Sequence, residues 1–455
     1  MNIRSITLIL AGFLTLGSHA QESYTLTLPQ AREYALQHNK TLLNARDQAS
    51  ATKAKYRETL AQGLPQIDGS LDYLTYFNYE LNFSMGSGEE PQIDYSLLDA
   101  GDFEVLDALG QMFSSEPIVM GDQLTGKVQA SQLIFSGQFW AGLRMAKIAR
   151  KLADQNVAAS ENDVIENITN TYCLILTSEQ ILRILADNFN NLEKILDHTR
   201  NYFKAGIAEE TDVDQIRITV SQLENTRKSM ERLLQLNYNM FKFQLGVAPD
   251  TRIVLADSLE QVLGLINPDA TIDPDFDIKQ NINFQLMESQ VLLTKKQLDL
   301  QKWGYGPTIA GFYSYTEKFV SSGFDLTPNS VAGISLSVPL FSSGMRNARV
   351  SQSRINLDIA QRNQEMVRDQ LELQKSQLVY NYQNAIENYN VQKENIEVAG
   401  RVYRSIQNKY QQGMASSLDL TQANSNFLTA ENNYLSSAMT LLQAKTSLEK
   451  LYNRL

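Results

Sequence analysis

The apolar residues between 138 and 203 recur every three or four positions, which is the spacing of a coiled-coil helix. No proline interrupts the stretch, because none occurs between Pro117 and Pro249. The pattern therefore predicts a single helix, roughly 100 Å long at about 1.5 Å per residue. A helix of this length suits a tube or a stalk, not a globular domain. The seam positions are Ile175, Leu182, Leu185, Phe189, Leu192, Leu196, Thr199 and Phe203.

The same pattern returns after an offset of 207 residues, the separation of Gly137 from Gly344. The second seam lies in a stretch without proline after Pro339 and consists of Tyr382, Tyr389, Ile396, Ala399, Tyr403, Ile406 and Tyr410. Further pairs with this offset are Gly206 and Gly413, Asp212 and Asp419, and Glu224-Asn225 and Glu431-Asn432. An ungapped match of this length indicates an internal duplication.

The segments between the helices follow a period of two. From Ile67 to Phe83 apolar and polar residues alternate, with many aromatic side chains, which predicts a strand at about 66–84. One face would meet lipid through Leu71, Tyr73 and Phe77, and the other would meet water. An ordinary half-buried sheet strand is the alternative. Further strands are expected at about 122–135, 308–319 and 330–339.

The expected layout begins with a secretory signal peptide at 1–20, which has a basic residue, a short apolar run and small residues before the cut. Repeat 1 covers 21–248 and repeat 2 covers 274–455, with a linker at 249–273. Each repeat has the order helix, two strands, long helix and return helix. The ranges expected within the repeats are a first helix from about Pro29 to Leu60 with a break near His38-Asn39, an acidic loop at 84–120, a return helix at about 212–245, and a second-repeat helix from Pro274 to about Lys302.

Composition narrows the function. The formal net charge is −11, and loss of Arg4 with the signal peptide makes it −12, which argues against nucleic acid as a partner. Cys173 is the single cysteine, so no internal disulfide is expected. The mature histidines, His38 and His198, are far apart, and no group of residues has metal-ligand spacing. We therefore expect no enzyme, no metal and no cofactor.

The predicted strands set a requirement for assembly. An open sheet edge is not tolerated in lipid, because its backbone groups lose water without finding partners. Four strands cannot close a barrel, since the smallest natural membrane barrels use about eight. Several chains must therefore combine their strands into one β-barrel, joined to a barrel of helices.

Short motifs at both strand-to-helix steps and at both helix ends resemble the TolC-like outer-membrane efflux channels. The motifs are Ser131-Gln-Leu-Ile-Phe-Ser-Gly137, Pro339-Leu-Phe-Ser-Ser-Gly344, Phe203-x-x-Gly206-x-x-x-x-x-Asp212-Val and Tyr410-x-x-Gly413-x-x-x-x-x-Asp419-Leu. The resemblance covers nearly the whole mature chain. The first helix departs from the family pattern, with His38-Asn-Lys-Thr-Leu-Leu43 where relatives often have Asn-Pro before the leucine.

The resemblance implies a homotrimer in the outer membrane of a Gram-negative bacterium, with a periplasmic extension. A twelve-stranded β-barrel would continue into a twelve-helix α-barrel, with two structural repeats per chain. It implies a passive export duct of a tripartite efflux or type I secretion system, served by a periplasmic adaptor (a membrane fusion protein) and an inner-membrane pump. The alternatives are a periplasmic adaptor, expected to have one helical hairpin, and a non-conducting coiled-coil stalk.

The resemblance also assigns roles to residues. The turns that dock the adaptor would be Gly206, Ile207, Ala208, Gly413, Met414 and Ala415. The periplasmic gate would be formed by Asp419, Asp212 and Gln422. Some relatives have a second aspartate at the position of Gln422, so weaker charge selectivity is expected here. Both aspartates also suit a helix N-cap, a role compatible with a gate.

Overall fold

The computed structural model describes residues 23–77, 79–81, 118–266, 271–273, 275–320 and 327–455. The expected signal peptide and nearly all of the expected acidic loop lie outside these residues. The chain divides into two compact units, and each takes segments from both expected repeats. The helical unit consists of Met1–Thr52, Arg150–Leu292 and Asp358–Leu455, and the strand unit of Lys53–Ala149 and Leu293–Leu357.

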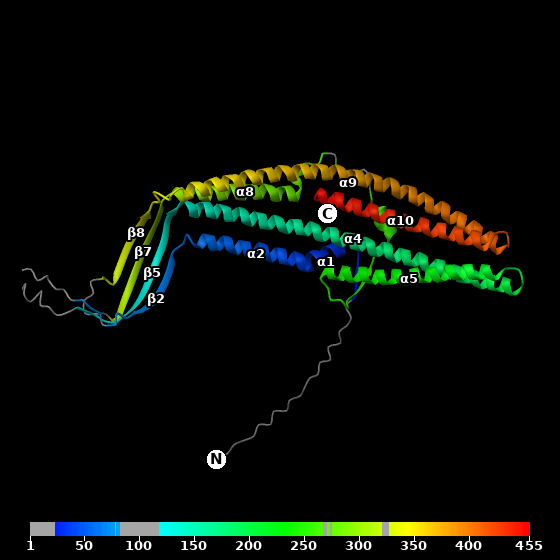
Figure 1. The fold of residues 1–455 in the computed structure, drawn as a ribbon, viewed down its shortest axis with the longest axis horizontal. Coiled ribbons are helices and arrows are strands. Elements are labelled where there is room, and N and C mark those ends of the chain that lie inside the picture. Colours follow the sequence, from blue (N-terminus) through cyan, green and yellow to red (C-terminus); the bar gives the residue numbers. More distant parts are fainter. Residues whose placement is uncertain (1–22, 78, 82–117, 267–270, 274, 321–326) are drawn as a thin grey trace, which may run out of the picture. The chain divides into compact units, whose positions relative to one another are not determined.

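Two very long helices dominate the secondary structure (Figure 1). Helix α4 has 68 residues and α9 has 67, and both end at the same place in the duplicated pattern. Each is followed by a return helix of about half its length. The helices are α1 Leu28–His38, α2 Lys40–Ala61, α4 Gly137–Lys204, α5 Glu210–Leu245, α6 Leu259–Gly264, α8 Ile282–Lys302, α9 Met345–Gln411 and α10 Ser417–Leu451. Among the described residues, none of these helices has both the length and the apolar character needed to cross a membrane.

The first helix is broken where the sequence predicted. Thr27 caps α1 in a capping box with Gln30, and proline occupies the first turn. Asn39 then stops α1 in an extended conformation and starts α2, because its Oδ1 accepts hydrogen bonds from the backbone N–H groups of Thr41 (2.9 Å) and Leu42 (3.1 Å). The Asn39 amide also donates to the carbonyl oxygen of Gln244 at 2.6 Å, which holds the break against the end of α5.

One hydrophobic cluster of the helical unit forms around Tyr172 of α4, which is fully buried. Its ring packs edge-on against Phe241 of α5, with centroids 6.0 Å apart. Its hydroxyl donates to the carbonyl oxygen of Leu26 at 3.0 Å and lies 2.8 Å from a carboxylate oxygen of Asp257. The buried side chain thus joins strand β1 (Ser23–Leu26) to the segment that follows strand β6 (Arg252–Leu255). These two strands pair in parallel.

The strand unit is built on a four-stranded antiparallel sheet with the order β2-β5-β7-β8 (Figure 1). Its strands are β2 Gln66–Leu74, β5 Gln123–Ser136, β7 Thr308–Val320 and β8 Ser330–Ser337. β5 pairs with β7, so the two expected repeats meet in the middle of one sheet. A separate short pair joins β3 (Tyr79–Leu81) to β4 (Ile118–Met120).

Three sequence predictions are wrong in detail. The strand expected at about 66–84 ends at Leu74, and Phe77 has a positive φ of 52°, which ends the extended run. Phe77 is therefore outside the sheet on which the sequence placed it. The linker expected at 249–273 contains β6 and α6, because β6 has a pairing partner in β1. The helix expected from Pro274 starts at Ile282, after a short 3₁₀ turn at Ile278–Gln280.

Candidate functional site: the sheet faces and the helical tips

The two faces of the four-stranded sheet differ in chemistry. Residues that pair across an antiparallel ladder point to the same side, so the register assigns each side chain to a face. The first face carries Ile67, Gly69, Leu71 and Tyr73 of β2, Leu124, Gly126, Val128 and Ala130 of β5, Ile309, Gly311, Tyr313 and Tyr315 of β7, and Ala332, Ile334 and Leu336 of β8. Apart from Gln132, Glu317 and Ser330, this face is apolar across all four strands, and we call it the apolar face.

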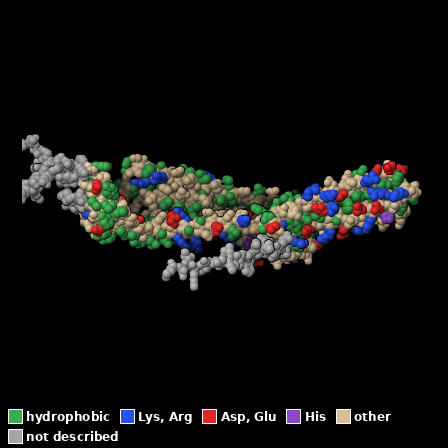
Figure 2. All heavy atoms as spheres, turned by 90° about the horizontal axis from the view of Figure 1, so that it is seen from below, with side chains coloured by type: hydrophobic (Ala, Val, Ile, Leu, Met, Phe, Trp, Pro, Cys, Tyr) green, Lys and Arg blue, Asp and Glu red, His purple; other side chains and the backbone are tan. Residues whose placement is uncertain are grey.

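The opposite, polar face carries Gln66, Asp68, Ser70 and Asp72 of β2, Thr125, Lys127, Gln129 and Ser131 of β5, Ser314 and Thr316 of β7, and Ser335 and Ser337 of β8. Its apolar exceptions are Leu74, Leu133, Ala310, Phe312 and Val331. Figure 2 shows hydrophobic side chains gathered over the strands on one side of the molecule. Leu71 and Tyr73 remain 69% and 64% exposed in the single chain, and exposed apolar surface of this kind is typical of membrane or protein contacts.

The two edges of this sheet are open in the single chain. β2 and β8 each pair on one side only, within the described residues. β2 is exposed along its whole length and has no proline after Pro65. An edge of this kind offers unpaired backbone groups to another strand. The sheet is therefore suited to further pairing with other chains.

The turns that join the long helices to their return helices, here called the helical tips, have the same backbone geometry. Gly206 and Gly413 have φ angles of 75° and 72°. At the first tip the N–H of Ile207 bonds to the carbonyl oxygen of Tyr202 at 2.9 Å, and at the second the N–H of Met414 bonds to that of Lys409 at 2.8 Å. This is the Schellman arrangement, in which a glycine supplies the left-handed residue. The duplication in sequence is thus reproduced in backbone structure.

Asp212 and Asp419 occupy the same position in their return helices, but they are not the N-cap residues. The caps are Glu209 and Ser416, and the aspartates lie three residues later. An oxygen of each carboxylate accepts the backbone N–H of its cap residue, at 3.1 Å for Asp212 and 3.0 Å for Asp419. Both aspartates therefore stabilise a helix start, as the N3 residue of a capping box.

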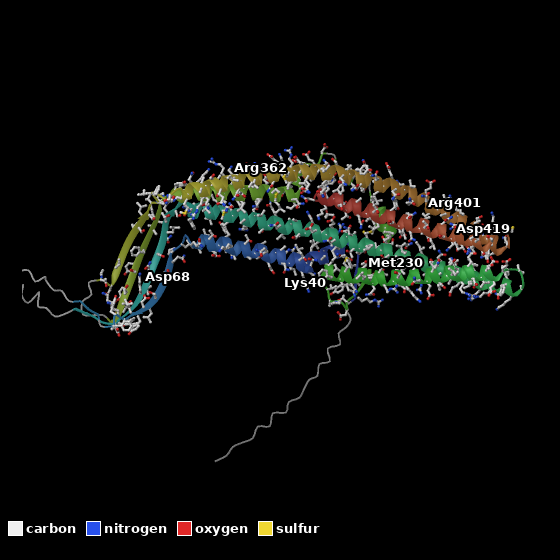
Figure 3. All side chains as sticks on the ribbon, viewed as in Figure 1. Lys40, Asp68, Met230, Arg362, Arg401 and Asp419 are labelled. Carbon is white, nitrogen blue, oxygen red and sulfur yellow. The ribbon has the colours of Figure 1, made fainter. Side chains whose placement is uncertain are left out.

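The second carboxylate oxygen distinguishes the two aspartates. Oδ1 of Asp212 accepts a hydrogen bond from the hydroxyl of Ser417, which is buried at the other tip. The described residues give Oδ1 of Asp419 no partner, since the Ser416 hydroxyl bonds to Oδ2 at 2.7 Å. The hydroxyl and backbone of Ser416 hold the pKa of Asp419 below its usual value. Asp419 is thus an exposed, ionised carboxylate near the end of α9 (Figure 3).

The two tips contact each other in the helical unit. The hydroxyls of Thr199 and Tyr410 are 2.6 Å apart and buried. The hydroxyl of Tyr202 donates to the carbonyl oxygen of Gln411 at 3.3 Å. Together with the bond between Ser417 and Asp212, these contacts hold α4, α9 and the return helices together at the turns. Sequence reasoning missed all three, because the partners lie more than 200 residues apart.

The remaining residues predicted at the tips are solvent-accessible. Ile207 and Met414, at equivalent positions, are 74% and 65% exposed, and Ala208 and Ala415 are half-buried. Exposed apolar side chains at a turn suit a contact with another protein. Gln422 is also exposed, and its amide donates to Asn426 one turn later at 2.9 Å.

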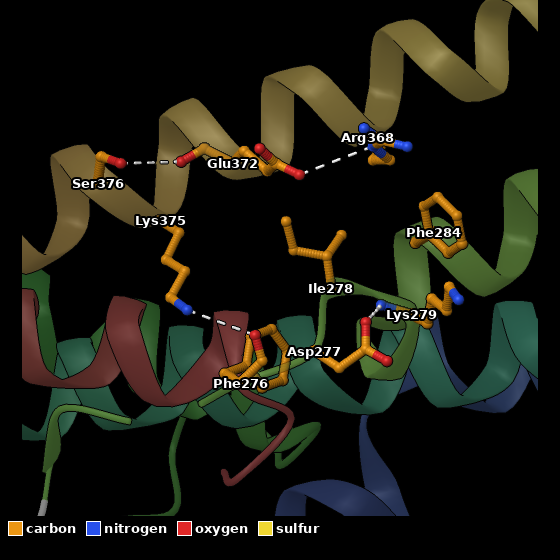
Figure 4. Close-up of a pocket in the computed structure, with 9 residues that line it drawn as sticks. All are labelled: Phe276, Asp277, Ile278, Lys279, Phe284, Arg368, Glu372, Lys375 and Ser376. Carbon is orange, nitrogen blue, oxygen red and sulfur yellow. Dashed lines mark hydrogen bonds and ion pairs between the residues drawn. The ribbon is translucent and has the colours of Figure 1, made fainter. Parts of the chain in front are cut away.

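One cavity of the helical unit has the size of an enzyme site but lacks a cluster of catalytic side chains. The cavity in Figure 4 has a volume of about 550 Å³, and two of its cations have local partners. Lys375 donates to the carbonyl oxygen of Phe276 at 3.3 Å, and Arg368 lies 3.7 Å from Glu372. No group of three or more histidine, cysteine, aspartate or glutamate side chains in the described part of the chain could hold a metal ion.

Glu431 of α10 is a buried carboxylate that the duplication helps to explain. Its equivalent in α5, Glu224, bonds to Lys228 at 2.6 Å. At the position of Lys228 the second copy has Leu435, so Glu431 has lost that cation. Its Oε2 has no hydrogen-bond partner among the described residues. Burial, aided by nearby Asp187, raises the pKa of Glu431 to about 7.

We expect Glu431→Gln to stabilise the protein at alkaline pH and to leave it nearly unchanged at acid pH. A raised carboxylate pKa means that the folded state keeps a proton that the unfolded state releases, so stability falls as pH rises from about 4.5 to 7. The glutamine cannot ionise, and its advantage at pH 8 should approach about 3 kcal/mol. Thermal unfolding between pH 4.5 and 8 measures the effect. Glu224→Gln is the matched control and should show no such gain; equal pH profiles for wild type and Glu431→Gln would contradict the assignment.

Comparison with known proteins agrees with this architecture. The family model for outer membrane efflux proteins matches residues 31–241 and 278–454. The outer membrane protein TolC of Salmonella enteritidis is 21% identical over 259 residues, which are 52% of this chain and 50% of that protein. The sequence match to this relative thus spans about half of its length.

Solved structures of outer-membrane channels share the fold. CusC superposes with a TM-score of 0.73 at 14% identity, covering 94% of this chain and 93% of that one. VceC of Vibrio cholerae gives 0.69 at 15% identity, with 93% and 95% covered. CmeC of Campylobacter jejuni gives 0.72 at 14% identity, with 100% and 94% covered.

The sheet with one apolar face and the duplicated long helices define an outer-membrane protein of the efflux-channel class. The chain belongs to the outer membrane efflux protein family, which confirms the resemblance found in its sequence. It is therefore located in the outer membrane and is a transport protein, not an enzyme.

Proposed function

We propose that the protein is the passive outer-membrane duct of a tripartite efflux or type I secretion system. Three chains would combine their four-stranded sheets into one barrel, with the apolar face toward lipid and the polar face toward the lumen. The observation that carries the proposal is a sheet with one predominantly apolar and one predominantly polar face, whose two edge strands lack a second partner in the described part of the chain. CmeC, a structural relative, is described as an outer membrane channel, and CusC as forming a transmembrane channel.

The helical tips support the second half of the proposal. Two equivalent turns, each with a left-handed glycine and an exposed apolar residue, contact each other in the helical unit. Such a paired surface suits a periplasmic adaptor that connects the duct to an inner-membrane pump. A protein with two equal hairpins does not fit the single hairpin expected of an adaptor.

The test is expression in a Gram-negative host, followed by fractionation, mass measurement of the native complex and conductance in a planar bilayer. A duct predicts an outer-membrane trimer with discrete conductance steps. A trimer that never conducts would indicate a structural stalk, and a monomer in the periplasmic fraction would overturn the proposal.

Leu71→Lys should disrupt the assembled barrel, since Leu71 is in the middle of the apolar face of β2. A basic side chain facing lipid near the bilayer midplane costs roughly 2–4 kcal/mol. The neighbouring variant Ser70→Lys is the control, because Ser70 points to the polar face near Asp72. We expect the first variant to lower the temperature at which the oligomer dissociates and the second to leave it unchanged. Equal effects of the two variants would mean that the apolar face does not meet lipid.

A further inference from the structure

A second cavity in the helical unit has a different character from that of Figure 4. It has a volume of about 410 Å³, within the range of small-molecule sites. Helices α1, α4, α6 and α10 all contribute to its wall. Most of its surface is apolar and comes from Leu28, Pro29, Val262, Leu265, Ile266 and Leu442.

The guanidinium of Arg32 lies in this apolar wall with its terminal nitrogens unpaired. Its Nε donates to the hydroxyl of Thr169 at 2.9 Å, and the described residues give its two terminal nitrogens no hydrogen-bond partner. Burial lowers the pKa of Arg32, while the charge of Glu449 opposes this shift. Arginine stays protonated in proteins, so the cavity contains a fixed positive charge.

The other charged groups of the wall are already paired. Asp257 accepts from the N–H of Leu28 at 2.7 Å and lies 2.8 Å from the hydroxyl of Tyr172. Lys445 bonds to Glu449 at 2.6 Å. The thiol of Cys173 also lines the cavity, and burial raises its pKa to about 12, so it stays protonated. Arg32 is therefore the charged group of this wall that is available to a ligand.

We propose that this cavity binds a single-chain anionic amphiphile, with a carboxylate head on Arg32 and an apolar tail between Val262, Leu265 and Leu442. The planar guanidinium offers two parallel N–H donors, which match the two oxygens of a carboxylate. The volume corresponds to roughly a dozen water-sized groups, enough for one medium-length chain but not for a two-chain lipid. This site goes beyond the duct function and does not depend on conduction.

The ligand would contact segments that are far apart in the chain. Arg32 belongs to α1, Val262 to α6 and Leu442 to α10. A molecule that touches all three stabilises the folded state by binding to it and not to the unfolded chain. Binding should therefore raise the unfolding temperature of the full-length protein in a saturable manner.

The experiment uses the full-length protein in a nonionic detergent, with sodium decanoate as the probe. Decanol and decyltrimethylammonium have the same chain without the negative charge. Titration calorimetry should show saturable binding of decanoate. Decanol and decyltrimethylammonium should bind with at least tenfold lower affinity. Arg32→Met should lower the affinity for decanoate at least tenfold, and Arg32→Lys should lower it less. Arg183→Met, which changes an exposed arginine of α4 outside the cavity, should have no effect.

Two further measurements test the site without relying on the folding of Arg32→Met. Val262→Phe fills the cavity without removing charge and should also abolish decanoate binding. A photoreactive decanoate should label wild-type peptides that contain Val262 or Leu442. Equal binding of decanoate and decanol, unaltered binding to a folded Arg32→Met variant, or labelling confined to other peptides would overturn the assignment.

Discussion

Replacing Gly413 with valine should reduce export to the background level while the oligomer remains in the outer membrane. Gly413 has a φ of 72°, a conformation that costs an L-residue about 1–2 kcal/mol and is worst for a β-branched side chain. No atom lies within 4 Å of an added Cβ, so the damage comes from the backbone and not from a clash. The turn must rearrange, and Met414 then leaves the position from which it would contact an adaptor. The equivalent variant Gly206→Val should behave in the same way.

The variant Gly413→Asn shows whether the defect comes from backbone strain or simply from the absence of glycine. Asn adopts the left-handed region far more readily than valine, so Gly413→Asn should retain most of the export. The measurements are the export of a fluorescent pump substrate, the capture of the adaptor by the purified duct, and the amount of oligomer in the membrane. Normal export by both valine variants would show that the tips are not the docking site. Loss of the oligomer itself would instead indicate a defect in folding.

The long helices and the sheet faces were predictable from sequence because each depends on a local period. The seam from Ile175 to Phe203 predicted a helix at 138–203, and α4 spans Gly137–Lys204. The alternation from Ile67 to Tyr73 predicted the two faces of β2, and the ladder with β5 has them. The same rule failed at Phe77, because alternation continues in the sequence while the backbone turns there.

Features that depend on distant partners were out of reach. Strand β6 forms because it pairs with β1. Their first paired residues, Ser23 and Arg252, are 229 residues apart in the sequence. The N-cap position suggested for Asp212 is wrong by three residues, since Glu209 is the cap, and the bond of Asp212 to Ser417 crosses 205 residues. A sequence pattern identifies candidates for such contacts, but only the fold brings their partners together.

Of the two aspartates at the tips, Asp419 is expected to have the stronger effect on the ion selectivity of the channel. In a trimer, three copies that face the tunnel axis would form a carboxylate ring, which attracts cations. Asp419 is exposed and has an oxygen without a partner in the described chain, whereas both oxygens of Asp212 accept hydrogen bonds. The Ser416 hydroxyl lowers the pKa of Asp419 in the single chain, while like charges in a ring raise it. The ring should therefore lose its cation preference at a higher pH than an isolated Asp419 would.

Charge and capping can be separated with two variants at neighbouring positions. Asp419→Asn removes the charge but keeps an acceptor for the N–H of Ser416, and Ser416→Ala removes the capping hydroxyl but keeps the charge. A ring predicts that Asp419→Asn reduces cation preference and relieves block by multivalent cations in planar bilayers, and that Ser416→Ala and Asp212→Asn leave both unchanged. A purely structural aspartate predicts the opposite: Ser416→Ala would lower the unfolding temperature, and Asp419→Asn would conduct with wild-type selectivity. The second pattern would remove Asp419 from the gate and leave it as part of the capping box.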